Sequence, residues 1–184
     1  MKKTILALAL TVVAFSASAA SIDWTLATGR SGYMTDSTGA KLTGTAYLLL
    51  TDSLTGVTFN SEQDIVDLAL GGSDGALAIS DGINKDTKTS TDDRLTAPTS
   101  YSFTVLVFDS VNKEYFLSST AYSEAAYNLS GDEYTDAKSI SFNQAEMYAN
   151  AATQGKQTYI SVPEPSVALM GLLGLGMLLK RRKA

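Results

Sequence analysis

Carboxylates are the main side chains in this 184-residue chain that could do acid–base chemistry, because histidine and cysteine are both absent. Their absence excludes a Ser-His-Asp triad, a cysteine nucleophile and a His/Cys zinc site. A pair of carboxylates could still hydrolyse a glycoside, and Asp109 and Glu114 form one candidate pair. They flank a predicted turn, however, where polar residues have a structural role. We therefore predict no catalytic or cofactor-binding residue and no enzyme, and a small carboxylate-dependent hydrolase is the third interpretation.

A cation site is the other chemistry that these residue types allow. Calcium binds carboxylate and carbonyl oxygens, and five oxygen-bearing side chains lie close together in one polar stretch. They are Asp81, Asn84, Asp86, Asp92 and Asp93. The EF-hand pattern fails here, because Ile83 stands at its third position and Asp86 stands where it needs glycine. We predict no metal site, with calcium binding in this stretch as an open alternative.

Aromatic side chains could stack on sugars, which would make the chain a carbohydrate-binding or adhesive module. The candidates are Trp24, Tyr33, Tyr47, Tyr101, Tyr115, Tyr122 and Tyr127. Most of them fall in predicted strands, where cross-strand packing is the usual role of an aromatic residue. Carbohydrate binding is therefore the second interpretation.

The part of the chain between the two ends is strongly acidic. The whole chain has 14 cations and 19 anions, and six of the cations lie in terminal segments that contain no acid. Residues 20–165 therefore carry 14 − 6 = 8 cations against 19 anions, a net charge of −11. Such a surface repels nucleic acids and anionic lipids, so we predict no nucleic-acid partner.

The N-terminal residues have the three parts of a secretory signal peptide. Two lysines are followed by an apolar stretch over residues 5–15 and then by Ala17-Ser18-Ala19. Small residues at Ala17 and Ala19 match the A-x-A pattern that signal peptidase recognises. We predict export through the Sec translocon and cleavage after Ala19, so that residues 1–19 take no part in the fold.

The C-terminal residues form a second unusual segment. Pro163-Glu164-Pro165 precedes residues 166–179, which carry no charge, and Lys180, Arg181, Arg182 and Lys183 follow. A helix of fourteen residues would be about 21 Å long. The hydrocarbon core of a bilayer is about 30 Å thick, so this predicted transmembrane helix is short. The four cations favour the cytoplasmic side of the membrane, which places the preceding chain outside.

These last residues closely resemble a PEP-CTERM sorting signal. The resemblance covers the stretch V-P-E-P-S, the glycine-bearing apolar segment and the terminal K-R-R-K, that is, residues 162–184. It implies that Pro163, Glu164 and Pro165 are the recognition motif, and that Lys180 to Lys183 are the basic stop. It also implies processing by exosortase, transient retention in the inner membrane of a diderm bacterium, and delivery to the cell surface or extracellular matrix, where extracellular polysaccharide is the expected neighbour. Tails of this kind occur on proteins of many types, so the resemblance says nothing about the remaining fold.

Short strands separated by turn residues dominate residues 20–161. Period-two patterns and hairpin signals predict strands over 21–27, 43–51, 100–109, 114–121, 138–142 and 157–162. Segment 100–109 with 114–121 is the clearest hairpin. A capping pattern at Ser61 predicts one helix, and the apolar spacing of Phe142, Ala145 and Ala149 a second. Residues 71–100 are predicted to be a long polar loop. The expected fold is a mainly β, antiparallel sandwich-like domain with one or two short helices.

Overall fold

The computed structural model describes residues 19–26, 33–83, 86–97, 99–118, 121–127, 139–142 and 158–163. Within them the chain is mainly β, as predicted. The strands are β1 (Ala20–Leu26), β2 (Gly44–Leu50), β3 (Leu77–Ile79), β4 (Thr87–Asp92), β5 (Ser100–Asp109), β6 (Glu114–Leu117), β7 (Tyr122–Ala125), β8 (Ser139–Phe142) and β9 (Ile160–Ser161). A short 3-10 helix, η1 (Thr51–Leu54), and one α-helix, α1 (Glu62–Leu68), complete the described elements.

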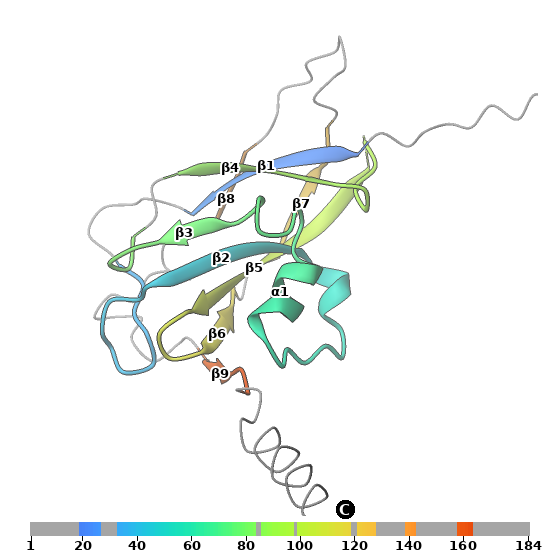
Figure 1. The fold of residues 1–184 in the computed structure, drawn as a ribbon. Helices are drawn as coiled ribbons and strands as arrows, with labels where there is room; N and C mark the ends of the chain where they lie inside the picture. Colours follow the sequence, from blue (N-terminus) through green and yellow to red (C-terminus); the bar gives the residue numbers. More distant parts are fainter. Residues whose placement is uncertain are drawn as a thin grey trace, which may run out of the picture.

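The strands form two sheets. The smaller sheet has the order β4-β1-β8, and the larger has the order β3-β2-β5-β6-β9, with β7 also paired to β5 (Figure 1). Among the described strands, every pair is antiparallel except β1 with β8, which run parallel with Trp24 opposite Ile140. The predicted antiparallel arrangement therefore does not hold for this pair, because β8 is joined to β1 by packing of distant segments rather than by a hairpin turn.

A first hydrophobic core is shared by the two sheets. On β1 the alternating residues Ile22, Trp24 and Leu26 are fully buried, which confirms the predicted period of two. They belong to the same apolar cluster as Leu48 of β2 and Val105 of β5 in the larger sheet. The smaller sheet is thus held to one side of the larger one by side chains from both.

A second core covers the other side of the larger sheet. Tyr47 and Leu49 of β2 contribute to it, so both faces of β2 are buried, as predicted for a central strand. Helix α1 lies over this face and contributes the fully buried Ile65 (Figure 1). The predicted cap is present, because Ser61 Oγ accepts a hydrogen bond from the backbone N–H of Asp64 at 3.2 Å.

The predicted hairpin is confirmed. Strand β5 pairs antiparallel with β6, from Leu106 opposite Leu117 to Asp109 opposite Glu114. Strand β6 ends at Leu117, earlier than predicted, and the first half of β5 pairs instead with β7. The long strand β5 also pairs with β2 on its other edge, which makes β5 the centre of the larger sheet.

The prediction of a loop over residues 71–100 was wrong, because this stretch contains β3 and β4. Strand β4 has the sequence TKTSTD and shows no apolar alternation, so its strand conformation depends on pairing with β1. The last predicted strand, 157–162, is reduced to β9. Phe142 lies at the end of β8, and the rest of the second predicted helix, with Ala145 and Ala149, falls outside the described residues.

Candidate functional site

The predicted signal-peptide cut and the first residue of the predicted sorting motif both lie next to strands of the structure. Ala19 precedes β1, and Ala20, the first residue of β1, is fully buried and pairs with Asp92. At the other end, Pro163 follows Val162, the residue directly after β9. No spacer therefore separates the strands from the predicted signal-peptide cut or from the first residue of the sorting motif.

Strand β9 holds the chain to the fold up to this junction. Ile160 pairs with Tyr115 of β6, and the backbone N–H of Val162 donates to the carbonyl oxygen of Lys113 at 2.8 Å. The side chain of Val162 is only 7% exposed and belongs to the second core. Pro163 has no N–H with which to continue the ladder, and it is exposed. In the described part of the chain, the last buried side chain therefore stands directly before the first residue of the predicted sorting motif.

The remaining residues of the predicted signals lie outside the described part of the chain. They are Ala17 at the signal peptide, Glu164 and Pro165 of the motif, the segment 166–179, and the basic residues Lys180, Arg181, Arg182 and Lys183. Among the residues that the structure describes, no helix has the length and apolar character needed to cross a membrane.

Asp109 and Glu114, the candidate carboxylate pair, lie opposite each other at the end of the β5–β6 hairpin. Both are buried, and Asp109 accepts hydrogen bonds from the backbone N–H groups of Val111 at 2.7 Å and Asn112 at 3.1 Å. Glu114 accepts one from the backbone N–H of Ser37 at 2.9 Å. The two carboxylates therefore stabilise the turn and its neighbouring loop, which is the structural role considered for them above.

Three residues that the sequence did not single out complete this polar cluster. The side-chain amide of Asn112 bridges Asp109 at 2.8 Å and Asp36 at 3.0 Å. The hydroxyl of Tyr159, just before β9, donates to the carbonyl oxygen of Thr35. Burial, together with the negative charges of Glu114, Asp36 and Asp109, raises the pKa of Tyr159 to about 12, so its hydroxyl stays protonated at neutral pH. The cluster joins the 33–42 segment to the chain that leads into β9.

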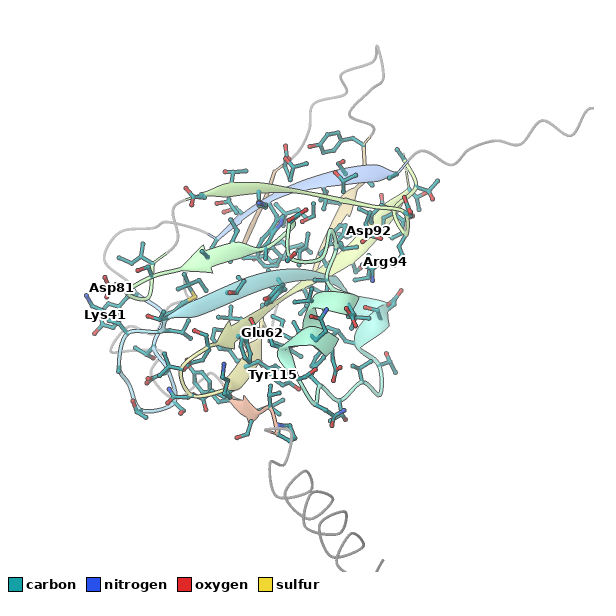
Figure 2. All side chains as sticks on the ribbon, viewed as in Figure 1. Lys41, Glu62, Asp81, Asp92, Arg94 and Tyr115 are labelled. Atoms are coloured by element: carbon teal, nitrogen blue, oxygen red, sulfur yellow. The ribbon has the colours of Figure 1, made fainter. Side chains whose placement is uncertain are left out.

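The polar stretch proposed for calcium is divided by β4. Asp86 precedes this strand and Asp92 ends it, so the two are separated by most of the length of a six-residue strand. Figure 2 shows Asp81 and Asp92 at opposite ends of the molecule, and Asn84 lies outside the described residues. Among the described residues, no group of three or more acidic, histidine or cysteine side chains is placed to hold a metal ion.

The aromatic candidates are mostly engaged in packing. Trp24 is fully buried, and Tyr47 and Tyr115 are nearly so. Tyr101 and Tyr122 are partly buried and pack against the first core, and Tyr127 is also partly buried. Tyr33 is 40% exposed, and the Nζ atom of Lys41 lies over its ring at 5.7 Å from the centroid. In the described part of the chain these residues do not form an exposed strip for sugar stacking.

Comparisons with models of protein families, with curated proteins and with solved structures found no match to this chain.

Proposed function

We propose that this chain is an exported, non-enzymatic protein of the cell surface or extracellular matrix of a diderm bacterium. In this proposal a sandwich-like domain over residues 20–161 is sorted by the PEP-CTERM signal that follows it, is processed by exosortase, and is linked to extracellular polysaccharide. The observation that carries the proposal is the position of Pro163, which is exposed directly after Val162, the last buried residue in the described part of the chain. An exposed residue at the start of a motif is accessible to a processing enzyme.

The proposed sequence of events follows from the chemistry of the two ends. Export through the Sec translocon and cleavage after Ala19 leave Ala20 as the N-terminus of the mature protein, and Ala20 is the first residue of β1. The short apolar segment 166–179 then holds the precursor in the inner membrane, with Lys180 to Lys183 on the cytoplasmic side. The motif lies at the outer surface of the membrane, where exosortase can cleave it and release the acidic domain to the cell surface.

Mass spectrometry of the surface-released protein tests this proposal. We expect the released wild-type protein to start at Ala20 and to lack peptides that cover residues 167–179. The triple variant Pro163→Ala/Glu164→Ala/Pro165→Ala should keep these peptides and remain in the membrane fraction. Pro98→Ala removes the one proline outside the motif and serves as the control, which should be processed like the wild type.

Two results would contradict the proposal. Tail peptides in the released wild-type protein would show that the tail is a permanent membrane anchor. Unchanged processing of the triple variant would show that another signal directs release.

The outer face of the smaller sheet favours carbohydrate binding as a second candidate function. On β4, Thr87, Thr89 and Thr91 are exposed. Thr87 lies opposite Thr25 of β1, Thr89 donates a hydrogen bond to Asp23, and Thr91 bonds to the buried Ser21. Hydroxyl and carboxylate groups of this kind hydrogen-bond to the hydroxyls of a neutral glycan. Retention of the purified protein on a column of the host's own polysaccharide, reduced by Thr87→Val/Thr89→Val and unaffected by Thr38→Val, would support this function. Equal retention of all three proteins would exclude this face.

A further inference from the structure

Exposed apolar side chains lie on the strands and the turn near Val162. The described residues include six large hydrophobic residues that are well exposed: Tyr33, Val57, Ile83, Val111, Leu117 and Ile160. Three of the six lie on β6, on β9 or in the turn that precedes β6. We call Val111, Leu117 and Ile160 the exit patch; they are 70%, 38% and 44% exposed.

The strand register and one backbone hydrogen bond relate the exit patch to Val162. Ile160 lies opposite Tyr115 on the neighbouring strand, so Leu117, two residues further along β6, is on the same face of the sheet. Diagonal neighbours of this kind are about 7–8 Å apart. Val111 belongs to the turn that ends at Lys113, whose carbonyl oxygen accepts the N–H of Val162. Ile160 and the turn that contains Val111 therefore lie next to Val162, and Leu117 lies further along β6 on the same face as Ile160.

The sequence leaves very little chain between this point and the predicted membrane segment. Pro163, Glu164 and Pro165 are the three residues that separate Val162 from residue 166. The four Cα–Cα steps from Val162 to residue 166 span at most about 14 Å when fully extended. The polar headgroup layer on one side of a bilayer is itself about 5–7 Å thick. In a membrane-anchored precursor, Val162 must therefore lie within about 10 Å of the headgroup layer.

We infer that the exit patch contacts the headgroup interface of the bilayer while the precursor is anchored. This inference rests on the proposed anchoring by the tail. The short connection Pro163-Glu164-Pro165 determines which side of the domain faces the membrane. The exposed apolar side chains on that side would lose water on contact with it. The matching lipid surface is a neutral, zwitterionic one, because residues 20–165 carry a net charge of −11. Lys113, exposed in the same turn as Val111, is a cation on this side of the domain.

The absence of cysteine allows the contact to be measured at single positions. The full chain would be purified with its tail intact from a host that lacks exosortase and reconstituted in phosphatidylcholine vesicles. An environment-sensitive NBD label would be attached to Val111→Cys or Ile160→Cys. Thr87→Cys is the matched control, because Thr87 is exposed on β4, which lies across the molecule from β9 (Figure 1). At Val111 and Ile160 we expect the NBD emission maximum to shift to the blue and the emission to be quenched by spin-labelled lipid. At Thr87 we expect neither change.

A second variant separates the contact from the anchor. A Gly-Ser spacer of about ten residues between Val162 and Pro163 adds a mean reach of about 17 Å and should abolish the quenching at Val111 while the protein still floats with the vesicles. Flotation of the labelled protein without quenching at either patch position overturns the inference and leaves the anchor intact. Failure to float overturns the proposed anchor itself, and the inferred contact with it.

Discussion

Arg94 and Asp92 form a two-bond ion pair that ties the end of β4 to the end of α1. The Nε and Nη2 atoms of Arg94 donate to the two carboxylate oxygens of Asp92, each at 2.7 Å. The same guanidinium donates to the backbone oxygen of Leu68 at 2.8 Å and to that of Ala69 at 2.7 Å. Because α1 ends at Leu68, no further helical turn supplies backbone N–H donors to these two carbonyl oxygens. Figure 2 shows the pair beside the helix.

Removing the charge of Asp92 should weaken this connection. We expect Asp92→Asn to lower the free energy of unfolding by about 1 kcal/mol, because charge-assisted bonds are lost at a partly exposed site. The neighbouring exposed change Asp93→Asn is the control and should leave stability nearly unchanged. Urea unfolding of both variants measures the difference. Equal stability of Asp92→Asn and wild type would show that the pair contributes nothing.

The contribution of Asp92 should also depend on pH. Burial acts to raise the pKa of Asp92, but hydrogen bonds from Arg94 and Gly71 outweigh burial and lower the pKa below its ordinary value. Because the pKa is lower in the folded state, the stabilisation is fully present above about pH 4, the ordinary pKa of aspartate, and is lost as the pH falls through the folded-state value. The stability difference between wild type and Asp92→Asn should therefore shrink below about pH 4. A difference that is constant from neutral pH to strongly acidic pH would contradict this assignment.

Ser90 is expected to be important for the first core. Its hydroxyl accepts a hydrogen bond from the indole N–H of Trp24 at 3.0 Å and donates to the carbonyl oxygen of Gly75 at 3.2 Å. Both side chains are fully buried. Ser90→Ala leaves the indole N–H without its partner and should cost about 1–3 kcal/mol. Trp24 is the single tryptophan of the chain, so its fluorescence reports unfolding directly. Ser123→Ala, at an exposed position of β7, should have little effect.

Gly44 should not accept a side chain. A Cβ atom added there would lie 1.9 Å from the carbonyl oxygen of Phe108, on the strand paired with β2. We expect Gly44→Ala to destabilise the protein by about 3 kcal/mol or more, because β2 and β5 must move apart. Gly39→Ala adds a Cβ with no atom within 4 Å, so it should cost only the strain of its positive φ, about 1–2 kcal/mol. Thermal unfolding followed by circular dichroism would rank the two variants, and a smaller loss for Gly44→Ala would contradict the close approach.

Tyr159 should stabilise the chain that leads into β9 in a pH-dependent way. Tyr159→Phe removes the hydrogen bond to Thr35 and should cost about 1 kcal/mol at neutral pH. The pKa of Tyr159, raised to about 12 mainly by burial, exceeds that of an unfolded tyrosine near 10. The stabilisation linked to this proton is fully present below about pH 10 and is lost as the pH rises toward 12. Unfolding experiments at neutral pH and near pH 11, compared between wild type and variant, should show the difference shrinking.

The sequence alone determined the elements whose signals are local. The period of two in Ile22, Trp24 and Leu26 predicted a strand with one buried face, and the fully buried side chains confirm it. Ser61 predicted the start of α1, because an N-cap bonds within its own helical turn. The hairpin of β5 and β6 was predicted for the same reason, since a short turn brings its two strands together. Pro163-Glu164-Pro165 was identified as a sorting motif from sequence and remains a prediction.

The tertiary structure decided what depends on partners far away in the chain. The polar strand β4 has no pattern of its own and exists through its pairing with β1, about seventy residues earlier. The parallel pairing of β1 with β8 and the meeting of Asp36 with Asn112 also join distant segments. Likewise, the sequence places Val162 directly before the predicted motif. Only the hydrogen bond to Lys113 and the burial of the Val162 side chain show that the fold extends to that residue. Such contacts gain their free energy from groups that a local pattern does not contain, so they form only when the whole domain folds.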